Sequence, residues 1–164
     1  MKTIIRFTTF RNYCFLTSFV LVALFFVPSF TLAATMSVSP NTGVYVAGKT
    51  FTVRVVVNTD GKPVNAAEGT LKFNPQELTV VSVDKSNSIF NLWVTEPTFS
   101  NSAGTITFSG GMPSGYTGSA GTIFNVTFRT TSASTARVSM TSGSVLANDG
   151  MGTNVLSGMN GGTF

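Results

Sequence analysis

The sequence predicts an all-β protein, built as a two-sheet antiparallel β-sandwich. Three observations predict this class. Apolar and polar residues alternate with a period of two in several segments, most clearly in Phe51–Asn58 and Phe124–Arg129. Gly, Pro, Asn and Asp residues separate these segments at intervals of about ten residues, which is typical of turns between short strands. No run of useful length has the helical period, so several short strands around one core are expected.

Residues 1–34 are predicted to be an export signal that is removed before the domain acts. Its basic start is formed by Lys2, Arg6 and Arg11. An apolar run, Tyr13 to Leu32, follows, and Ala33-Ala34 offers a small-residue cleavage site. The alternative is an uncleaved membrane anchor, because roughly twenty apolar residues can span a bilayer. Pro28 and the Ala33-Ala34 end favour cleavage, so one exported domain over residues 35–164 is predicted, secreted or at the cell surface.

Composition excludes several classes of function. Three of the ten Lys and Arg residues lie in the leader, which leaves seven against six Asp and Glu. No basic cluster remains for nucleic acid, and only the N-terminal segment offers contact with a membrane. Cys14 lies in the leader and the chain has no His, so disulfides, thiolate metal sites and His-based catalysis are excluded. The remaining domain, residues 35–164, is large enough to be stabilised by its hydrophobic core.

The expected strands follow in order along the chain. They are Thr35–Ser39, Phe51–Asn58, Val64–Phe73, Leu78–Val83, Phe90–Phe99, Thr105–Phe108, Phe124–Arg129 and one or two strands within Ala136–Val145. Asp60-Gly61 and Asn74-Pro75 predict tight turns, because Pro lacks an amide hydrogen and Gly tolerates positive φ. Pro97 predicts that the fifth strand is an edge strand or contains a bulge. Gly110–Ser119 is predicted to be a loop because of its Gly and Ser content.

The C-terminal residues predict one of two arrangements. Asn160 to Phe164 reads as a turn followed by the first residues of another strand. Either Val155–Phe164 supplies a shortened closing strand, or the sequence is a fragment of a longer surface protein and lacks part of its last strand. A missing strand would leave an exposed sheet edge.

No catalytic or metal site is predicted, so the chain is not expected to be an enzyme or to carry a cofactor. A glycosidase needs two carboxylates about 5–9.5 Å apart, and nothing in the sequence pairs any two of the six acids. The segment Asn148–Asn154 is similar to a calcium loop at first sight. It lacks oxygen ligands at alternate positions and the terminal Glu, so a turn is predicted there.

The polar faces of the strands are the best candidate for a binding surface. If the apolar residues of the third, sixth and seventh strands fill one side of a sheet, their polar neighbours share the other. Those neighbours are Thr70, Lys72, Thr105, Thr107, Asn125 and Thr127. Antiparallel sandwiches commonly have a solvated face, which is the simpler interpretation. Trp93 and Tyr116 could form a platform for a sugar ring, or Trp93 could pack in the core or at a sheet edge.

The order and spacing of several motifs resemble those of cohesin domains, the receptor modules of cellulosome scaffolds. These motifs are the strand, Asn-Pro corner and strand of Val64–Val83, then Gly104–Gly111, Gly121–Phe128 and Val145–Gly150. The resemblance implies a jelly-roll, Ig-like topology that closes with a strand beside the first. It also implies that a dockerin, a partner with two short calcium-loop helices, docks on the sheet face described above. Any calcium would then belong to the partner.

The first functional hypothesis is therefore a non-catalytic module that binds a dockerin-like protein. The predicted contact residues are Thr70, Lys72, Trp93, Thr105, Thr107, Asn125 and Thr127. The second hypothesis is a carbohydrate-binding module that takes a polysaccharide through Trp93. The third is an adhesin or surface-layer domain that acts as a spacer.

Overall fold

The computed structural model describes residues 33–164, so nearly all of the predicted export signal lies outside the described residues. The strands are β1 (Ala34–Ser39), β2 (Thr50–Asn58), β3 (Val64–Phe73), β4 (Leu78–Asp84), β5 (Leu92–Ser100), β6 (Thr105–Tyr116), β7 (Gly121–Thr130), β8 (Arg137–Ala147), β9 (Leu156–Asn160) and β10 (Gly162–Thr163). Within the described part of the chain, no helix is long and apolar enough to cross a membrane.

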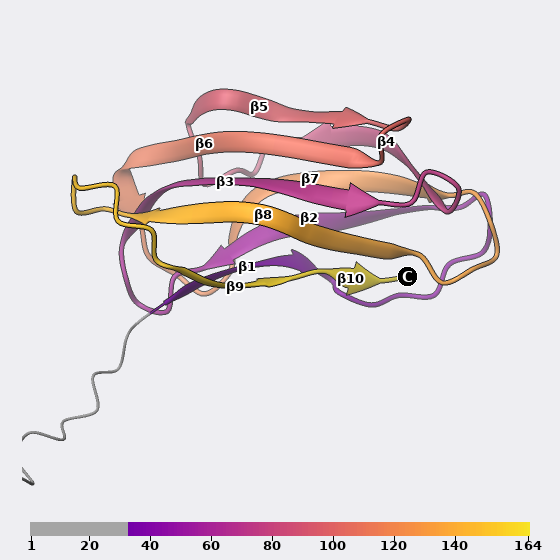
Figure 1. Ribbon diagram of the computed structural model, residues 1–164, viewed down its shortest axis with the longest axis horizontal. Helices are drawn as coiled ribbons and strands as arrows, with labels where there is room; N and C mark the ends of the chain where they lie inside the picture. Colours follow the sequence, from indigo (N-terminus) through magenta and orange to yellow (C-terminus); the bar gives the residue numbers. More distant parts are fainter. Residues whose placement is uncertain (1–32) are drawn as a thin grey trace, which may run out of the picture. The chain divides into compact units, whose positions relative to one another are not determined.

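Residues 33–164 form two five-stranded sheets that lie face to face (Figure 1). One sheet has the order β4-β7-β2-β1-β9, and the other has the order β10-β8-β3-β6-β5. All neighbours are antiparallel except β1 and β9, which pair in parallel. The predicted β-sandwich is confirmed, with this one parallel pair as the difference.

The core lies between the inner faces of the two sheets. Phe124, Phe128 and Leu71 are fully buried, as the period-two alternation predicts. Phe128 of one sheet packs edge to face against Phe73 of the other, with ring centroids 5.5 Å apart. Phe51 stacks on Phe128 within the first sheet at 5.7 Å. Aromatic contacts across the layer therefore hold the two sheets together.

The expected loop at Gly110–Ser119 is wrong for its first part, because β6 continues to Tyr116. Gly111 pairs with Ala66 of β3, and a Cβ atom on Gly111 would lie 2.4 Å from the carbonyl oxygen of Asn65. A Cβ on Gly110 would lie 2.7 Å from Cε3 of Trp93. These glycines therefore permit close packing within a strand instead of marking a turn.

Strands β5 and β8 correspond to two further expectations from the sequence. β5 is an edge strand, and its register with β6 shifts between Thr95 and Thr98, which brackets Pro97. The predicted edge with a bulge is confirmed. The segment from Ala136 onward was expected to form one or two strands, and it forms one long strand, β8.

The C-terminal segment forms two short strands, β9 and β10. β9 pairs in parallel with β1 from Ala34 to Ser37, and β10 then crosses to the other sheet and pairs with β8. Ala34, at the predicted boundary of the leader, is fully buried, and its amide donates to the carbonyl of Val155. Over this stretch β1 is thus paired with a neighbouring strand on both sides, β2 on one and β9 on the other.

Candidate docking face

The candidate docking face, or docking face, is the outer face of β8, β3, β6 and β5 in the second sheet (Figure 1). On β3, Leu71 and Phe73 point into the core, so Thr70 and Lys72, which alternate with them, point outward. The strand pairing brings Thr107 of β6 directly beside Thr70. Neighbouring strands lie about 4.8 Å apart, so the side chains form rows across the face.

Hydroxyl groups dominate these rows. The hydroxyl residues of the docking face are Thr70, Thr95, Thr98, Ser100, Thr105, Thr107, Ser109, Ser139, Ser142 and Ser144. One complete row runs Ser142, Thr70, Thr107, Thr98 across four strands. Thr98 Oγ1 and Thr107 Oγ1 are 3.3 Å apart, within hydrogen-bond distance. Such a row offers donors and acceptors without charge.

The middle of the docking face has a shallow hollow of about 390 Å³. Its floor includes the glycines of β3 and β8, Gly69 and Gly143, which pair with each other. Glu68 is the one acid lining the hollow, and the hydroxyl of Ser144 donates to its carboxylate at 3.2 Å. The hollow is lined by few charged groups, which suits shape-dependent contact better than ionic binding.

Apolar side chains are exposed at the β5 side of the docking face. Leu92 is 57% exposed and pairs with Gly111 of β6. Val94, in the bulge beside it, is 88% exposed. Exposed apolar groups next to a polar surface are typical of protein-binding sites.

Four of the seven predicted contact residues lie together on the docking face: Thr70, Lys72, Thr105 and Thr107. The prediction that Asn125 and Thr127 share this face is wrong, because their strand, β7, belongs to the other sheet. Thr127 shares a hydrogen bond with Thr52 of β2 on the outer face of that sheet. Alternation along each strand predicts which residues share a side, but it does not predict which sheet a strand joins.

Trp93 also does not share the face of the threonines. It pairs with Gly110, a core-side residue, and its ring packs edge to face against Phe90 at 5.8 Å. The ammonium of Lys85 lies 5.5 Å from the centre of the Trp93 ring. The partly buried Trp93 therefore matches the expectation of edge packing, and this arrangement does not favour an open platform for sugar.

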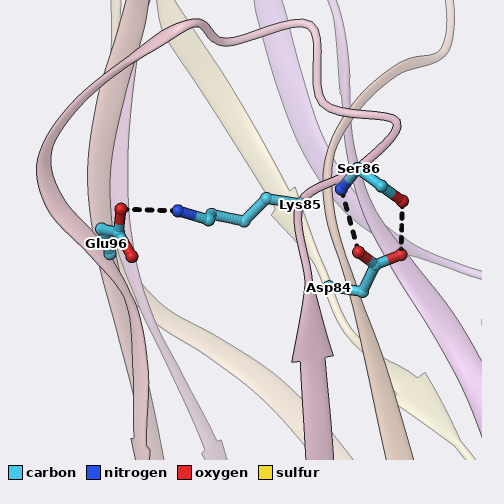
Figure 2. Close-up of polar contacts among 4 residues, drawn as sticks. All are labelled: Asp84, Lys85, Ser86 and Glu96. Atoms are coloured by element: carbon cyan, nitrogen blue, oxygen red, sulfur yellow. Dashed lines mark hydrogen bonds and ion pairs between the residues drawn. The ribbon is translucent and has the colours of Figure 1, made fainter.

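The same lysine forms the one ion pair among residues 33–164. Lys85 Nζ lies 2.6 Å from the carboxylate of Glu96, as Figure 2 shows. Beside it, the backbone amide and hydroxyl of Ser86 donate to the carboxylate of Asp84. These hydrogen bonds lower the pKa of Asp84 below its ordinary value. The ion pair links the start of the β4–β5 connection to β5, whereas the hydrogen bonds between Ser86 and Asp84 are local to the start of that connection.

The suspected calcium loop is a turn in the structure. Thr153 and the amide of Met151 donate to Asp149 and lower its pKa. Asn154 accepts hydrogen bonds from the amides of Val145 and Leu156. In the part of the chain that the structure describes, no three acidic, His or Cys side chains are placed to hold a metal ion.

Sequence reasoning missed Leu92 and Val94 as candidate contact residues. The available signal was the strand period itself, since an inward Trp93 places its neighbours on the opposite side or at the edge. Ser139, Ser142 and Ser144 were also missed, because the alternation within β8 does not show which strands lie beside it. Their place on the docking face follows from pairing with β3.

The geometry defines a β-sandwich in which the outer face of the β8-β3-β6-β5 sheet is open and rich in hydroxyl groups. The sequence matches the family described as cohesin domain over residues 34–162. The chain belongs to the cohesin family, whose members are non-catalytic binding modules. No curated protein sequence matches the chain.

Solved structures of cohesins have the same fold. The sixth cohesin of scaffoldin B from Acetivibrio cellulolyticus, solved with the Cel5 dockerin, has a TM-score of 0.61 at 18% identity over 80% of this chain and 96% of that one. Coh-OlpA from Clostridium thermocellum, solved with Doc918, has a TM-score of 0.63 at 10% identity over 80% and 96%. A non-cellulosomal cohesin from Archaeoglobus fulgidus has a TM-score of 0.59 at 20% identity over 80% and 89%. At these identities the similarity shows the fold alone.

Proposed function

We propose that this chain is an exported, non-catalytic module that docks a dockerin-like partner on the docking face. The observation that carries the proposal is the open face of the β8-β3-β6-β5 sheet in a chain of the cohesin family. Similar cohesins, such as the scaffoldin B and Coh-OlpA modules, were solved in complexes with dockerins.

The chemistry of the face supports a protein partner. Hydroxyl rows give orientation through hydrogen bonds, and the exposed Leu92 and Val94 supply apolar area whose burial gives affinity. The two central strands of the docking face, β3 and β6, are each paired with a neighbour on both sides, so the middle of the face is preformed. A preformed surface loses little conformational entropy when it binds, so a helix can rest on it without rearrangement.

The direct test uses dockerin modules encoded by the source organism, each expressed singly and titrated against the immobilised chain. With calcium present, at least one is expected to bind saturably, and a chelator should abolish binding because the partner's loops hold the calcium. The melting temperature of the chain alone should not respond to the chelator. Absence of binding by every dockerin in calcium would contradict the proposal.

Substitutions then locate the site. Thr70→Arg with Thr107→Arg puts two long side chains into adjacent positions of one row and should weaken binding at least about tenfold. Thr50→Arg with Thr52→Arg makes the same change on exposed positions of the other sheet and should leave affinity within about twofold. Equal effects of both pairs would show that the partner binds elsewhere.

A further inference from the structure

Two cations lie together at one end of the docking face. Lys72 of β3 pairs with Ser139 of β8, and Arg137 lies two residues before Ser139 on the same side of its strand. Diagonal neighbours of this kind lie about 7–8 Å apart. Both side chains are exposed and line a depression of about 470 Å³. Glu77 is the one acid in its lining, and no ion pair joins it to either cation among residues 33–164.

The opposite end of the docking face is apolar. Pairing across the sheet aligns a row that contains no charge and no hydroxyl group. The row is Leu146, Ala66, Gly111 and Leu92. Leu146 alternates with the buried Val145 and Ala147, so it lies on the outer side of β8. With Val94 exposed beside it, the row offers apolar area that stays in contact with water until a partner covers it.

The two ends are separated by a length that a helix can span. Lys72 lies six residues beyond Ala66 on β3, which is about 20 Å at a rise of about 3.3 Å per residue. An α-helix covers this distance in about 13 residues. Between the ends Glu68 is the one charged side chain on β3, and it already accepts a hydrogen bond from Ser144. The face therefore has a basic end, a hydroxyl-lined middle whose one acid is Glu68, and an apolar end.

We propose that the partner lays a helix along the docking face with carboxylate side chains over Lys72 and Arg137 and apolar side chains over Leu92. This inference rests on the proposed function and names the chemistry of its partner. A guanidinium presents a fork of donors that matches a carboxylate, and an ammonium supplies a compact point charge. Unpaired cations attract a partner of opposite charge and repel the same helix in the reversed orientation. The charge pattern thus selects both the partner and its direction.

The test uses a source-organism dockerin that binds the wild-type chain. Lys72→Glu with Arg137→Glu should weaken binding about tenfold or more at low ionic strength, with a smaller loss at high salt. Arg54→Glu with Arg129→Glu makes the same change in net charge on exposed positions of the other sheet and should stay within about twofold. Leu92→Ser should weaken binding at all salt concentrations. Val81→Ser, on the exposed edge strand β4, is its matched control. Thermal unfolding of each variant confirms that it is folded.

A second experiment reverses the charges on both sides of the interface. Replacing the dockerin carboxylates with Lys should restore binding to the Lys72→Glu, Arg137→Glu variant and weaken binding to the wild type. If the dockerin binds the double variant as tightly as the wild type, the inference is overturned while the proposed function stands. If no dockerin binds the wild type, the proposed function fails and this inference fails with it.

Discussion

Replacing Gly110 with Ala tests whether close packing of the edge strand β5 against β6 sets the position of Leu92 on the docking face. A Cβ atom at this position would lie 2.7 Å from Cε3 of Trp93 and 2.8 Å from the carbonyl oxygen of Leu92. The carbonyl is backbone, so it can move only if β5 moves away from β6. Leu92 would move with it, which couples the packing of Trp93 to the position of a proposed contact residue.

The expected loss of folding stability follows from the overlap between this Cβ atom and its two neighbours. Forcing an extra methyl group into a closely packed site typically costs about 1–3 kcal/mol. Gly110→Ala is therefore expected to lower the free energy of unfolding by about 1–3 kcal/mol, measured by urea denaturation with unchanged m-value. Binding of a dockerin should weaken in the same variant, because β5 is displaced even in the folded state. Adding Trp93→Leu should recover only part of the stability, since the Leu92 carbonyl remains in the way.

Gly158→Ala is the matched control for this substitution. A Cβ at Gly158, in β9, would lie 3.6 Å from Cγ2 of Thr35, which is ordinary contact. Its expected effect on stability is within about 0.5 kcal/mol. If Gly110→Ala were as stable as Gly158→Ala, the close pairing of β5 with β6 would be wrong, and so would the inward position of Trp93.

Three further predictions concern stability. Phe128→Ala should cost about 3–5 kcal/mol in urea denaturation, because the fully buried ring joins the two sheets; a cost below 1 kcal/mol would contradict that role. Lys85→Ala removes the pair with the largely exposed Glu96 and the contact with Trp93, and should cost about 1 kcal/mol or less; a larger loss would mean that the pair does more than fix the loop. Asp84→Ala should be less stable than wild type at neutral pH. The lowered folded-state pKa stabilises the protein above the unfolded pKa of about 3.9, and this contribution is lost as pH falls through the folded pKa. The difference in melting temperature should therefore shrink below about pH 4, and a difference that grew in acid would contradict the assignment.

The strands were largely predictable because one side of each is buried. Alternation at Phe51–Asn58 and Phe124–Arg129 has a direct physical cause, since a side chain that pointed the wrong way would expose apolar area to water. The corner at Asn74-Pro75 and the bulge near Pro97 were predictable from the missing amide hydrogen of Pro.

The arrangement of the strands in the two sheets could be predicted less well from the sequence. Asn125 and Thr127 alternate in the same way as Thr105 and Thr107, yet they lie on the other sheet, because sheet membership depends on pairing between distant segments. The glycines of β6 have the composition of a loop, and the approach of Trp93 to Gly110 and of the Asn65 carbonyl to Gly111 explains why this strand needs them. The basic end of the docking face likewise depends on Arg137 lying beside β3, which no local pattern shows.

The most direct test of the central claim is hydrogen–deuterium exchange of the chain with and without a bound dockerin. Amides of β3, β5, β6 and β8 are expected to gain protection, with the largest change around Thr107 and Leu92. Amides of β2 and β7, including those of Asn125 and Thr127, should be unchanged. Protection confined to β2 and β7 would contradict the assignment of the docking face.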